Sequence, residues 1–241
     1  MKHWKKQHIR RFKFWLKKVG KKDMFDAVNL EISTACNRKC AYCPNSIFPR
    51  GEIKNQRLMD LELINKILDE LGKLNFKGKI NTCHYNEPLL DKRLPEIAKL
   101  IKQKVPKCKL IINSNGDYLT EELENNLKKS GVDKISVSEH KDPNYKFNPM
   151  NNRCGLVNPI NLDLYPRCLF DTIELIIDVD GNVKICCNDY IGENIMGNLN
   201  KQSIVEIWNS ELFVKTRKDL RDWNFSLPMC KRCLNENTNK K

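Results

Sequence analysis

The strongest constraint on the fold is a repeated alternation of strand-like and helix-like sequence patterns from residue 24 onward. Alternation of this kind is typical of a parallel sheet covered by helices. A closed eight-stranded barrel needs about 250 residues, whereas the 241 residues here include a C-terminal segment with a different pattern. The sequence therefore predicts an α/β fold built on a partial (β/α)6 TIM barrel. The strand-like runs are 28–33, 79–85, 108–114 and 133–138, and the helical runs are 58–74, 94–104 and 119–131.

The pattern changes after residue 150, where an Asn- and Pro-rich stretch leads into two extended runs joined at Asp180-Gly181. An Asp-Gly pair between such runs is a hairpin signal, and helical periodicity follows near 203–220. We expect a small C-terminal hairpin and helix domain behind the barrel. The expected division is a basic helix at 1–23, the core at 24–155, the C-terminal domain at 156–236 and a polar tail at 237–241.

The net charge of +13 is concentrated near the beginning of the chain, because residues 1–22 hold ten Lys or Arg and no acid. Only +3 is left for the other residues, so the main body gives little reason to expect a nucleic-acid partner. Apolar residues recur in the basic segment at three- and four-residue steps, which predicts an amphipathic helix. That helix can contact an anionic membrane surface or an acidic partner, or it can pack its apolar face on its own domain.

The apolar stretches are short and interrupted by polar residues, so no segment is expected to span a bilayer. The basic N-terminal segment lacks the apolar core and cleavage site of a secretory signal. We therefore expect a cytoplasmic protein, in which thiols stay reduced unless a metal binds them. With eleven cysteines in the chain, metal binding is the leading explanation for any group of cysteines.

Three cysteines follow the first predicted strand at the spacing C-x3-C-x2-C: Cys36, Cys40 and Cys43. Three thiolates on a tight loop suit three corners of an iron–sulfur cubane, which usually takes four cysteines. A fourth cysteine does not lie nearby in the sequence, so one iron is expected to accept an external ligand. A zinc site with an open position is the alternative.

The segment ACNRKCAYCPN that carries these cysteines resembles the signature of the radical S-adenosylmethionine (radical SAM) family. The resemblance implies that the open iron binds S-adenosylmethionine and that an electron from the cluster cleaves it to a 5′-deoxyadenosyl radical. It also implies a reducing electron donor such as flavodoxin or ferredoxin, and a small-molecule substrate.

Further segments resemble family motifs at the ends of later predicted strands. YNEP has Asn86 in place of the usual glycine, and it implies that Glu87 binds the methionine amino group. NSNGD implies that Ser114 and Asn115 meet the ribose and the carboxylate. Because the carboxyl ends of barrel strands form one active-site face, these side chains are expected to lie together. The other candidates for this rim are Tyr42, which would lie against the adenine, and Ser138, Glu139 and His140 of SVSEH.

The C-terminal domain offers a second set of cysteines, namely Cys168, Cys186, Cys230 and Cys233. Their spacing resembles the twitch form of the SPASM domain, which implies an auxiliary [4Fe–4S] cluster and hence two [4Fe–4S] clusters in all. A structural Zn(Cys)4 site is the alternative. Cys187 is not expected to share the cluster with its neighbour, because adjacent residues on a strand point to opposite faces. The cysteines interpreted as buried thiols rather than ligands are Cys83, Cys108 and Cys154.

Beyond the basic segment the chain resembles radical SAM dehydrogenases that combine a core with a twitch domain. The resemblance implies oxidation of a secondary alcohol of a sugar or cyclitol to a ketone, in which the substrate loses a hydrogen atom, a proton and a second electron. It also implies that Arg153, in NNRCG, contacts the substrate. A radical SAM maturase that modifies a peptide is the first alternative. An RNA-modifying or RNA-binding protein that uses the basic segment is the second.

Overall fold

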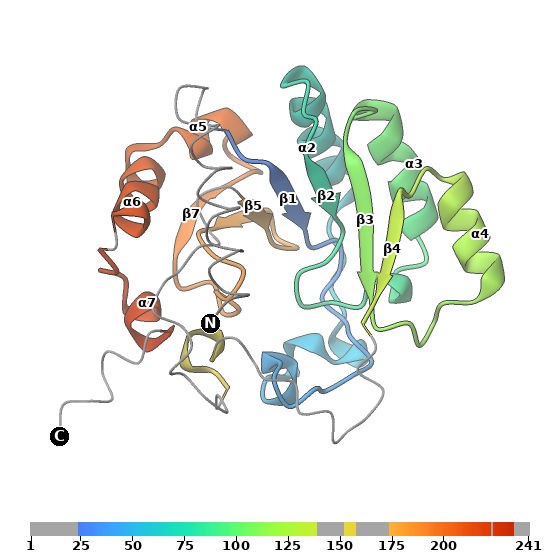
Figure 1. Cartoon of the computed structure of the whole chain (residues 1–241), viewed down its shortest axis with the longest axis horizontal. Coiled ribbons are helices and arrows are strands. Elements are labelled where there is room, and N and C mark those ends of the chain that lie inside the picture. Colours follow the sequence, from blue (N-terminus) through green and yellow to red (C-terminus); the bar gives the residue numbers. More distant parts are fainter. Residues whose placement is uncertain (1–23, 139–151, 158–173, 223, 234–241) are drawn as a thin grey trace, which may run out of the picture.

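The computed structural model describes residues 24–138, 152–157, 174–222 and 224–233. Within these ranges the chain forms one seven-stranded sheet of order β4-β3-β2-β1-β5-β6-β7 (Figure 1). The strands are β1 (Ala27–Leu30), β2 (Lys79–Asn81), β3 (Lys109–Ser114), β4 (Lys134–Val137), β5 (Glu174–Ile177), β6 (Asn182–Lys184) and β7 (Ile195–Asn198). The helices are α2 (Leu61–Lys73), α3 (Leu94–Lys104), α4 (Glu121–Lys129), α5 (Ile204–Trp208), α6 (Glu211–Arg221) and α7 (Pro228–Cys233). The short 3-10 helices are η1 (Pro44–Ser46), η2 (Pro49–Gly51), η3 (Ile53–Asn55), η4 (Pro88–Leu90) and η5 (Arg153–Gly155).

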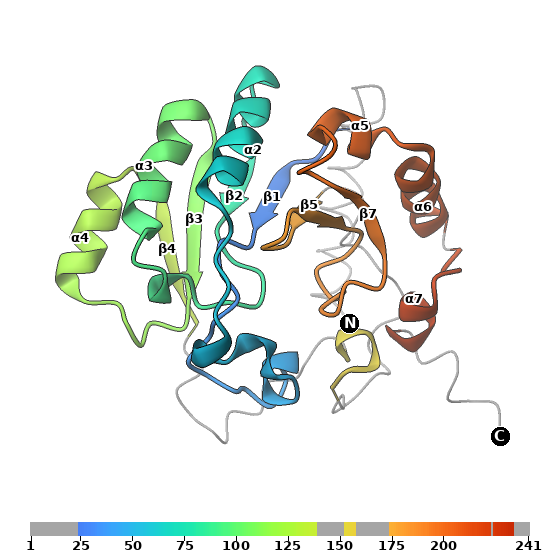
Figure 2. The same ribbon diagram turned by 180° about the vertical axis from the view of Figure 1, so that it is seen from behind.

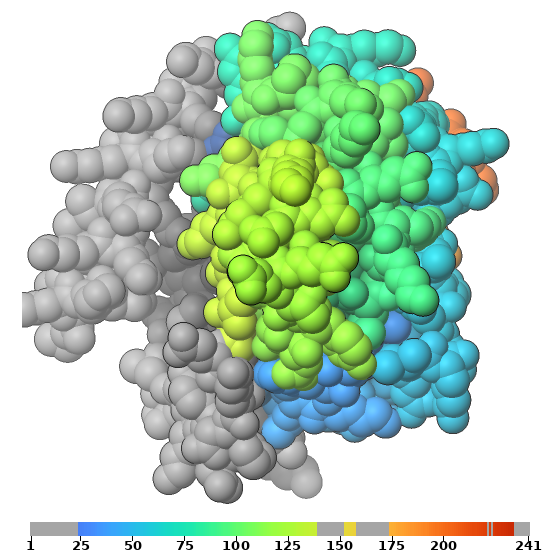
Figure 3. Space-filling model, turned by 90° about the vertical axis from the view of Figure 1, so that its right-hand side faces the viewer, coloured from blue at the N-terminus to red at the C-terminus, as the bar shows by residue number. Residues whose placement is uncertain are grey.

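Helices α2, α3 and α4 cover one face of the half-sheet formed by β2, β3 and β4 (Figure 2). They bury their apolar stripes there, as amphipathic helices do; in α2 the buried residues are Leu63, Ile64, Ile67, Leu68 and Leu71. Figure 3 shows α4 closing this end of the molecule, with the segment that follows β1 below it. The order of strands and helices agrees with the predicted α/β partial barrel.

Strand β1 lies in the middle of the sheet and joins its two halves. It pairs in parallel with β2 through Val28↔Ile80 and with β5 through Val28↔Leu175. All three side chains are fully buried. Strands β5 and β6 form an antiparallel pair around Gly181, whose φ of +80° suits a glycine turn. The predicted hairpin is confirmed, and it extends the core sheet directly.

The parallel strands end on the same side of the molecule, which is the lower side in Figure 1. The segment that contains η1, η2 and η3 lies there, below the end of β1 (Figure 1). The loop after β3 meets it through an ion pair between Arg38 and Asp117 (2.5 Å). The carboxyl ends of the strands therefore gather the segments in which the sequence places its candidate site residues.

The helical pattern near 203–220 forms two helices, α5 and α6, instead of the one that was predicted. Ser203 begins α5 with a capping box that includes Glu206, and the helix ends at Trp208 with Asn209 as its C-cap. Ser210 then accepts a hydrogen bond from the Phe213 N–H (3.3 Å) and begins α6. Small polar side chains satisfy the open N–H groups at the start of a helix. Asn209 and Ser210 therefore interrupt an apolar periodicity that continues from α5 into α6.

Part of the predicted organisation concerns residues outside the described ranges. These residues are the basic segment 1–23, Glu139, His140, Cys168 and the tail 237–241. Across the part of the chain that is described, none of the helices combines the length and apolar character needed to cross a membrane.

Candidate functional site

The loop after β1 carries Cys36, Cys40 and Cys43 as free, half-buried thiols. Backbone hydrogen bonds shape it: the Cys36 N–H donates to the Gly51 carbonyl (2.9 Å), and the Cys43 N–H donates to the Cys40 carbonyl (2.8 Å). Burial raises the pKa of Cys36 to about 11, with further contributions from Glu87 and the other two thiols. The predicted cluster ligands and Glu87 therefore act on one another within a single site.

Asn45 fastens this loop to the rest of the molecule. Its buried side-chain N–H donates to the Tyr85 carbonyl (2.7 Å), and its side-chain oxygen accepts from the Tyr190 hydroxyl (2.9 Å). Gly51 packs so closely against it that a Cβ at this position would lie 2.4 Å from Asn45 Cγ. Because Tyr85 follows β2 and Tyr190 follows β6, the loop is held by both halves of the sheet.

Glu87 lies at the carboxyl end of β2 and is 2% exposed. One carboxylate oxygen accepts hydrogen bonds from the Ser114 hydroxyl (2.8 Å) and the Leu89 N–H (3.0 Å). The other accepts from the Asn115 N–H (2.7 Å). A carboxylate oxygen has two lone pairs, so the second oxygen retains room for one more donor. The structure thus brings together Glu87, Ser114 and Asn115, which the sequence predicts to lie on one active-site face.

The other predicted rim residues lie around this group. The Asn115 side chain donates to Asn37 of the cysteine loop (2.8 Å), and the Ser138 N–H donates to the Ser114 carbonyl (2.9 Å). Burial and a hydrogen bond with Cys40 raise the pKa of Tyr42. Asn86, which replaces the glycine of the motif, accepts from the His84 N–H (2.9 Å) and so shapes the turn before Glu87.

A second group of thiols lies between the hairpin and α7. Cys186 is buried, and Cys230 and Cys233 are half-buried. Cys230 and Cys233 are three residues apart on α7, and side chains at this spacing are neighbours on a helix. The carbonyl oxygen of the neighbouring Cys187 lies 2.8 Å from His84 Nε2. Cys168, the fourth predicted ligand, lies outside the described residues.

Cys154 also belongs to this group, which the sequence did not predict. It is buried, as expected, and its carbonyl oxygen accepts a hydrogen bond from Arg232 Nε of α7 (3.0 Å). Cys108 is a buried thiol elsewhere in the core, and Cys83 is half-buried. In the described residues, no three His, Cys, Asp or Glu side chains are placed to hold a single metal ion. Spacing alone could not reveal the position of Cys154, because η5 meets α7 across nearly 80 residues of sequence.

Arg153 lies between the two groups of thiols. Its guanidinium donates to the Asn188 side chain just after the hairpin cysteines (2.9 Å). It also lies 5.9 Å from the centre of the Tyr85 ring. Burial raises the pKa of the Cys43 thiol, and the positive charge of Arg153 opposes that increase. The Tyr85 hydroxyl is buried and has no hydrogen-bond partner among the described residues. A cation and an unsatisfied hydroxyl therefore lie between the two thiol groups.

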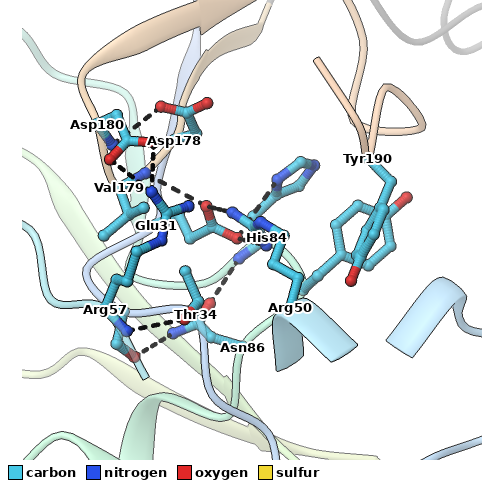
Figure 4. A network of polar contacts seen from close by, with 12 residues as sticks. Glu31, Thr34, Arg50, Arg57, His84, Asn86, Asp178, Val179, Asp180 and Tyr190 are labelled. Carbon is cyan, nitrogen blue, oxygen red and sulfur yellow. Dashed lines mark hydrogen bonds and ion pairs between the residues drawn. The ribbon is translucent and has the colours of Figure 1, made fainter. Parts of the chain in front are cut away.

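A buried ionic network, shown in Figure 4, links the segment after β1 to the hairpin that follows β5. Glu31 is fully buried and accepts two hydrogen bonds from Arg50 (3.0 and 2.5 Å). It also accepts from the Val179 N–H of the hairpin (3.3 Å). Although burial alone would raise the pKa of Glu31, the charge of Arg50 brings it below its ordinary value. Burial lowers the pKa of His84, beside Glu31, to about 4. The network was not predicted, because its members are far apart in the sequence.

Two family models match the chain. Residues 30–193 match the radical SAM superfamily, and residues 168–234 match an iron-sulfur cluster-binding domain of the SPASM type. The first match covers more than half of the chain and includes the cysteine loop, Glu87 and Ser114. The second includes Cys168, Cys186, Cys230 and Cys233 and excludes Cys154.

Individual relatives agree with this result. The chain is 30% identical over 237 residues to the S-adenosyl-L-methionine-dependent 2-deoxy-scyllo-inosamine dehydrogenase of Niallia circulans, covering 88% of this chain and 94% of the relative. It is 30% identical over 118 residues to a GTP 3′,8-cyclase of Nautilia profundicola, covering 47% of this chain and 34% of the relative. The crystal structure of BtrN in complex with AdoMet and 2-DOIA superposes with a TM-score of 0.78 at 29% identity, covering 87% of this chain and 93% of that one. The chain therefore belongs to the radical SAM superfamily.

Proposed function

We propose that the chain is a radical SAM oxidoreductase that oxidises a secondary alcohol of a cyclitol or sugar to a ketone. The observation that carries the proposal is the similarity to a 2-deoxy-scyllo-inosamine dehydrogenase along 94% of that relative's length. The likeness extends through both cysteine-bearing regions, and the fold agrees at a TM-score of 0.78.

The family implies a [4Fe–4S] cluster with S-adenosylmethionine, and the second domain implies an additional iron–sulfur cluster. The described residues fit these groups, because cysteine thiolates are the donors that such clusters take. Cys36, Cys40 and Cys43 would hold the first cluster. When bound, these groups supply a 5′-deoxyadenosyl radical that removes hydrogen from the substrate, and the protein supplies binding and positioning. The auxiliary cluster would be held by Cys168, Cys186, Cys230 and Cys233.

The residues around Glu87 would bind S-adenosylmethionine. The free lone pair of the Glu87 carboxylate suits an ammonium donor, because hydrogen bonds between charged groups are the strong ones. Ser114 and the Asn115 N–H fix the orientation of that carboxylate. Tyr42 would lie against the adenine, and Ser138 and Glu139 would complete the rim.

Arg153 and Tyr85 would bind the substrate. Arg153 is held in place by Asn188 and by the Tyr85 ring, and a planar guanidinium suits recognition of fixed polar groups. A hydroxyl of the substrate would satisfy the buried Tyr85 hydroxyl, which would otherwise remain costly to bury. A flavodoxin or ferredoxin would supply the reducing electron.

The proposal is tested with anaerobically reconstituted protein, S-adenosylmethionine and a chemical reductant. We expect 5′-deoxyadenosine and a ketone to form in equal amounts when 2-deoxy-scyllo-inosamine or a related cyclitol is added. Mass spectrometry measures both products. Formation of 5′-deoxyadenosine without a ketone from any cyclitol or sugar, but with modification of an added peptide, would favour the maturase alternative and contradict the proposal.

Replacing Glu87 by Gln is expected to weaken S-adenosylmethionine binding by about tenfold or more, because a hydrogen bond to a charged group is worth about 1.5–3 kcal/mol. Equilibrium dialysis with reconstituted protein measures the affinity. Glu52→Gln is the matched control, since that carboxylate lies in the segment after β1 and pairs with Lys39 at the surface. Equal affinities for Glu87→Gln and the unaltered protein would contradict the assigned role.

A further inference from the structure

A cleft between the segments 48–57 and 178–195 lies apart from the site described above. Its volume is about 700 Å³, which is within the range of sites that bind small molecules. The Tyr190 hydroxyl donates to Asn45 of the cysteine loop, so the Tyr190 side chain separates the cleft from that loop. The described residues that line the cleft include neither the proposed cluster ligands nor Glu87 or Arg153. They do include Phe48, Arg50, Asp178, Lys184, Tyr190 and Ile191.

Lys184 lines this cleft although its side chain is only 2% exposed. An ammonium group carries three N–H donors. Among the described residues, the Lys184 amine donates to the Tyr190 carbonyl at 3.3 Å. The Asp178 carboxylate lies 3.6 Å away, which is too far for a hydrogen bond. Because a buried charge with few hydrogen bonds is costly, the amine suits a further acceptor in the cleft.

The two carboxylates that line the cleft accept hydrogen bonds from other donors. One oxygen of Asp178 accepts from two backbone N–H groups of its own turn (both 3.0 Å), and the other accepts from the Asn182 side chain (3.2 Å). Asp180 pairs with Arg57 at the exposed rim. Since both carboxylates already have partners, the remaining donors of Lys184 favour an anion that enters from outside.

Apolar side chains also line the cleft. The rings of Phe48 and Tyr190 lie 5.5 Å apart, measured between their centres. Ile191 and Ile195, which follow Tyr190 in the chain, are 51% and 37% exposed. Pockets that combine apolar walls with a few polar groups bind small organic molecules. The lining therefore suits a ligand that has an apolar part as well as a negative charge.

We propose that this cleft binds a small organic anion, whose carboxylate or phosphate group accepts hydrogen bonds from Lys184 and whose apolar part lies against Phe48 and Ile191. Arg50 also lines the cleft, and Glu31, which binds it, is fully buried and does not (Figure 4). Hydrogen bonds between charged groups are the strong ones. The anion would occupy a site separate from those proposed for S-adenosylmethionine and the substrate, so the sites can be tested independently.

The test is isothermal titration calorimetry of the full chain, reconstituted anaerobically, with benzoate, phenyl phosphate and the uncharged benzamide. At least one of the two anions is expected to bind about tenfold more tightly than benzamide, because only an anion forms charge-assisted hydrogen bonds with Lys184. The tighter of the two identifies the acceptor group. Saturating S-adenosylmethionine should leave its affinity unchanged.

Lys184→Met is expected to weaken binding of that anion by about tenfold or more, the effect of losing a hydrogen bond to a charged group. Lys66→Met is the matched control, since the Lys66 amine also donates to backbone carbonyls, those of Leu199 and Gln202, but does not line the cleft. This control should bind the anion as the unaltered protein does.

A pair of variants at exposed Ile191 decides the question if Lys184→Met does not fold. Ile191→Glu should weaken binding of the anion and Ile191→Lys should strengthen it, each by about threefold, the scale of an exposed charge pair. Benzamide should bind equally to both. Equal affinity of the anion for the two Ile191 variants overturns the proposed site. So do anions that bind no better than benzamide, and an anion that S-adenosylmethionine displaces. Formation of 5′-deoxyadenosine without binding of either anion overturns this site alone and leaves the proposed function intact.

Discussion

Replacing Cys36, Cys40 and Cys43 together by Ala is expected to halve the iron of the reconstituted protein, from about eight to about four per chain. Formation of 5′-deoxyadenosine should be abolished. The reason is that the three thiols lie on one loop and share their site with Glu87, so their removal leaves the first cluster without protein ligands. Iron and sulfide analysis measures the first effect, and chromatography of the reaction products measures the second.

Cys83→Ala is the matched control for this experiment. Its thiol lies 3.5 Å from the Asn113 side chain at the same end of the sheet, but it is not on the cysteine loop. Iron content and cleavage should remain those of the unaltered protein. If the triple variant retained eight irons, or if the unaltered protein bound zinc, the assignment of the loop to an iron–sulfur cluster would be wrong.

Replacing Arg50 by Met is expected to lower the free energy of unfolding by about 3–5 kcal/mol, because it leaves a buried carboxylate without its countercharge. Glu31 is fully buried, and Arg50 is the residue that donates to both of its oxygens. Urea unfolding of the reconstituted protein, followed by circular dichroism, measures the loss. The double variant Glu31→Leu with Arg50→Met should recover most of it, since a buried pair exchanged for apolar groups is often neutral.

Arg57→Met provides the comparison with an exposed ion pair. Arg57 pairs with Asp180 at 2.8 Å, and the two side chains are 52% and 51% exposed. Exposed pairs contribute about 1 kcal/mol or less, so this variant should change stability little. Equal losses for the Arg50 and Arg57 variants would show that burial does not govern the cost.

Local signals in the sequence predicted the individual elements well. The helical run 94–104 coincides with α3, where Pro95 stands near the start and Lys102 and Lys104 near the end, as helix termini favour. The meeting of Glu87 with Ser114 was predictable because parallel strands end at one edge of the sheet. The Asn209–Ser210 break between α5 and α6 was missed, since two capping residues outweigh an unbroken apolar period.

Contacts between distant segments could not be predicted in the same way. The pairing of β5 with β1 joins residues nearly 150 positions apart, and local pattern specifies a strand without specifying its partner. The same holds for Glu31 with Arg50 and Val179, and for Cys154 with Arg232. Tertiary packing determines these contacts. They hold the site in place, whereas the motifs that identify it are local in the sequence.

The pairing of β1 with β5 fixes the span between the two cysteine-bearing segments that would hold the clusters. Strand β1 leads into the loop of Cys36, and β5 leads through its hairpin to Cys186. The hydrogen bond from the Glu31 N–H to the Ile177 carbonyl (2.9 Å) continues their ladder, so this sheet offers no hinge to vary the span. A strand can slide only in steps of about 3.3 Å per residue, and a single step would turn its buried side chains to the other face. A change in the register of β1 against β5 would therefore alter the separation of the two cysteine-bearing segments only in coarse increments.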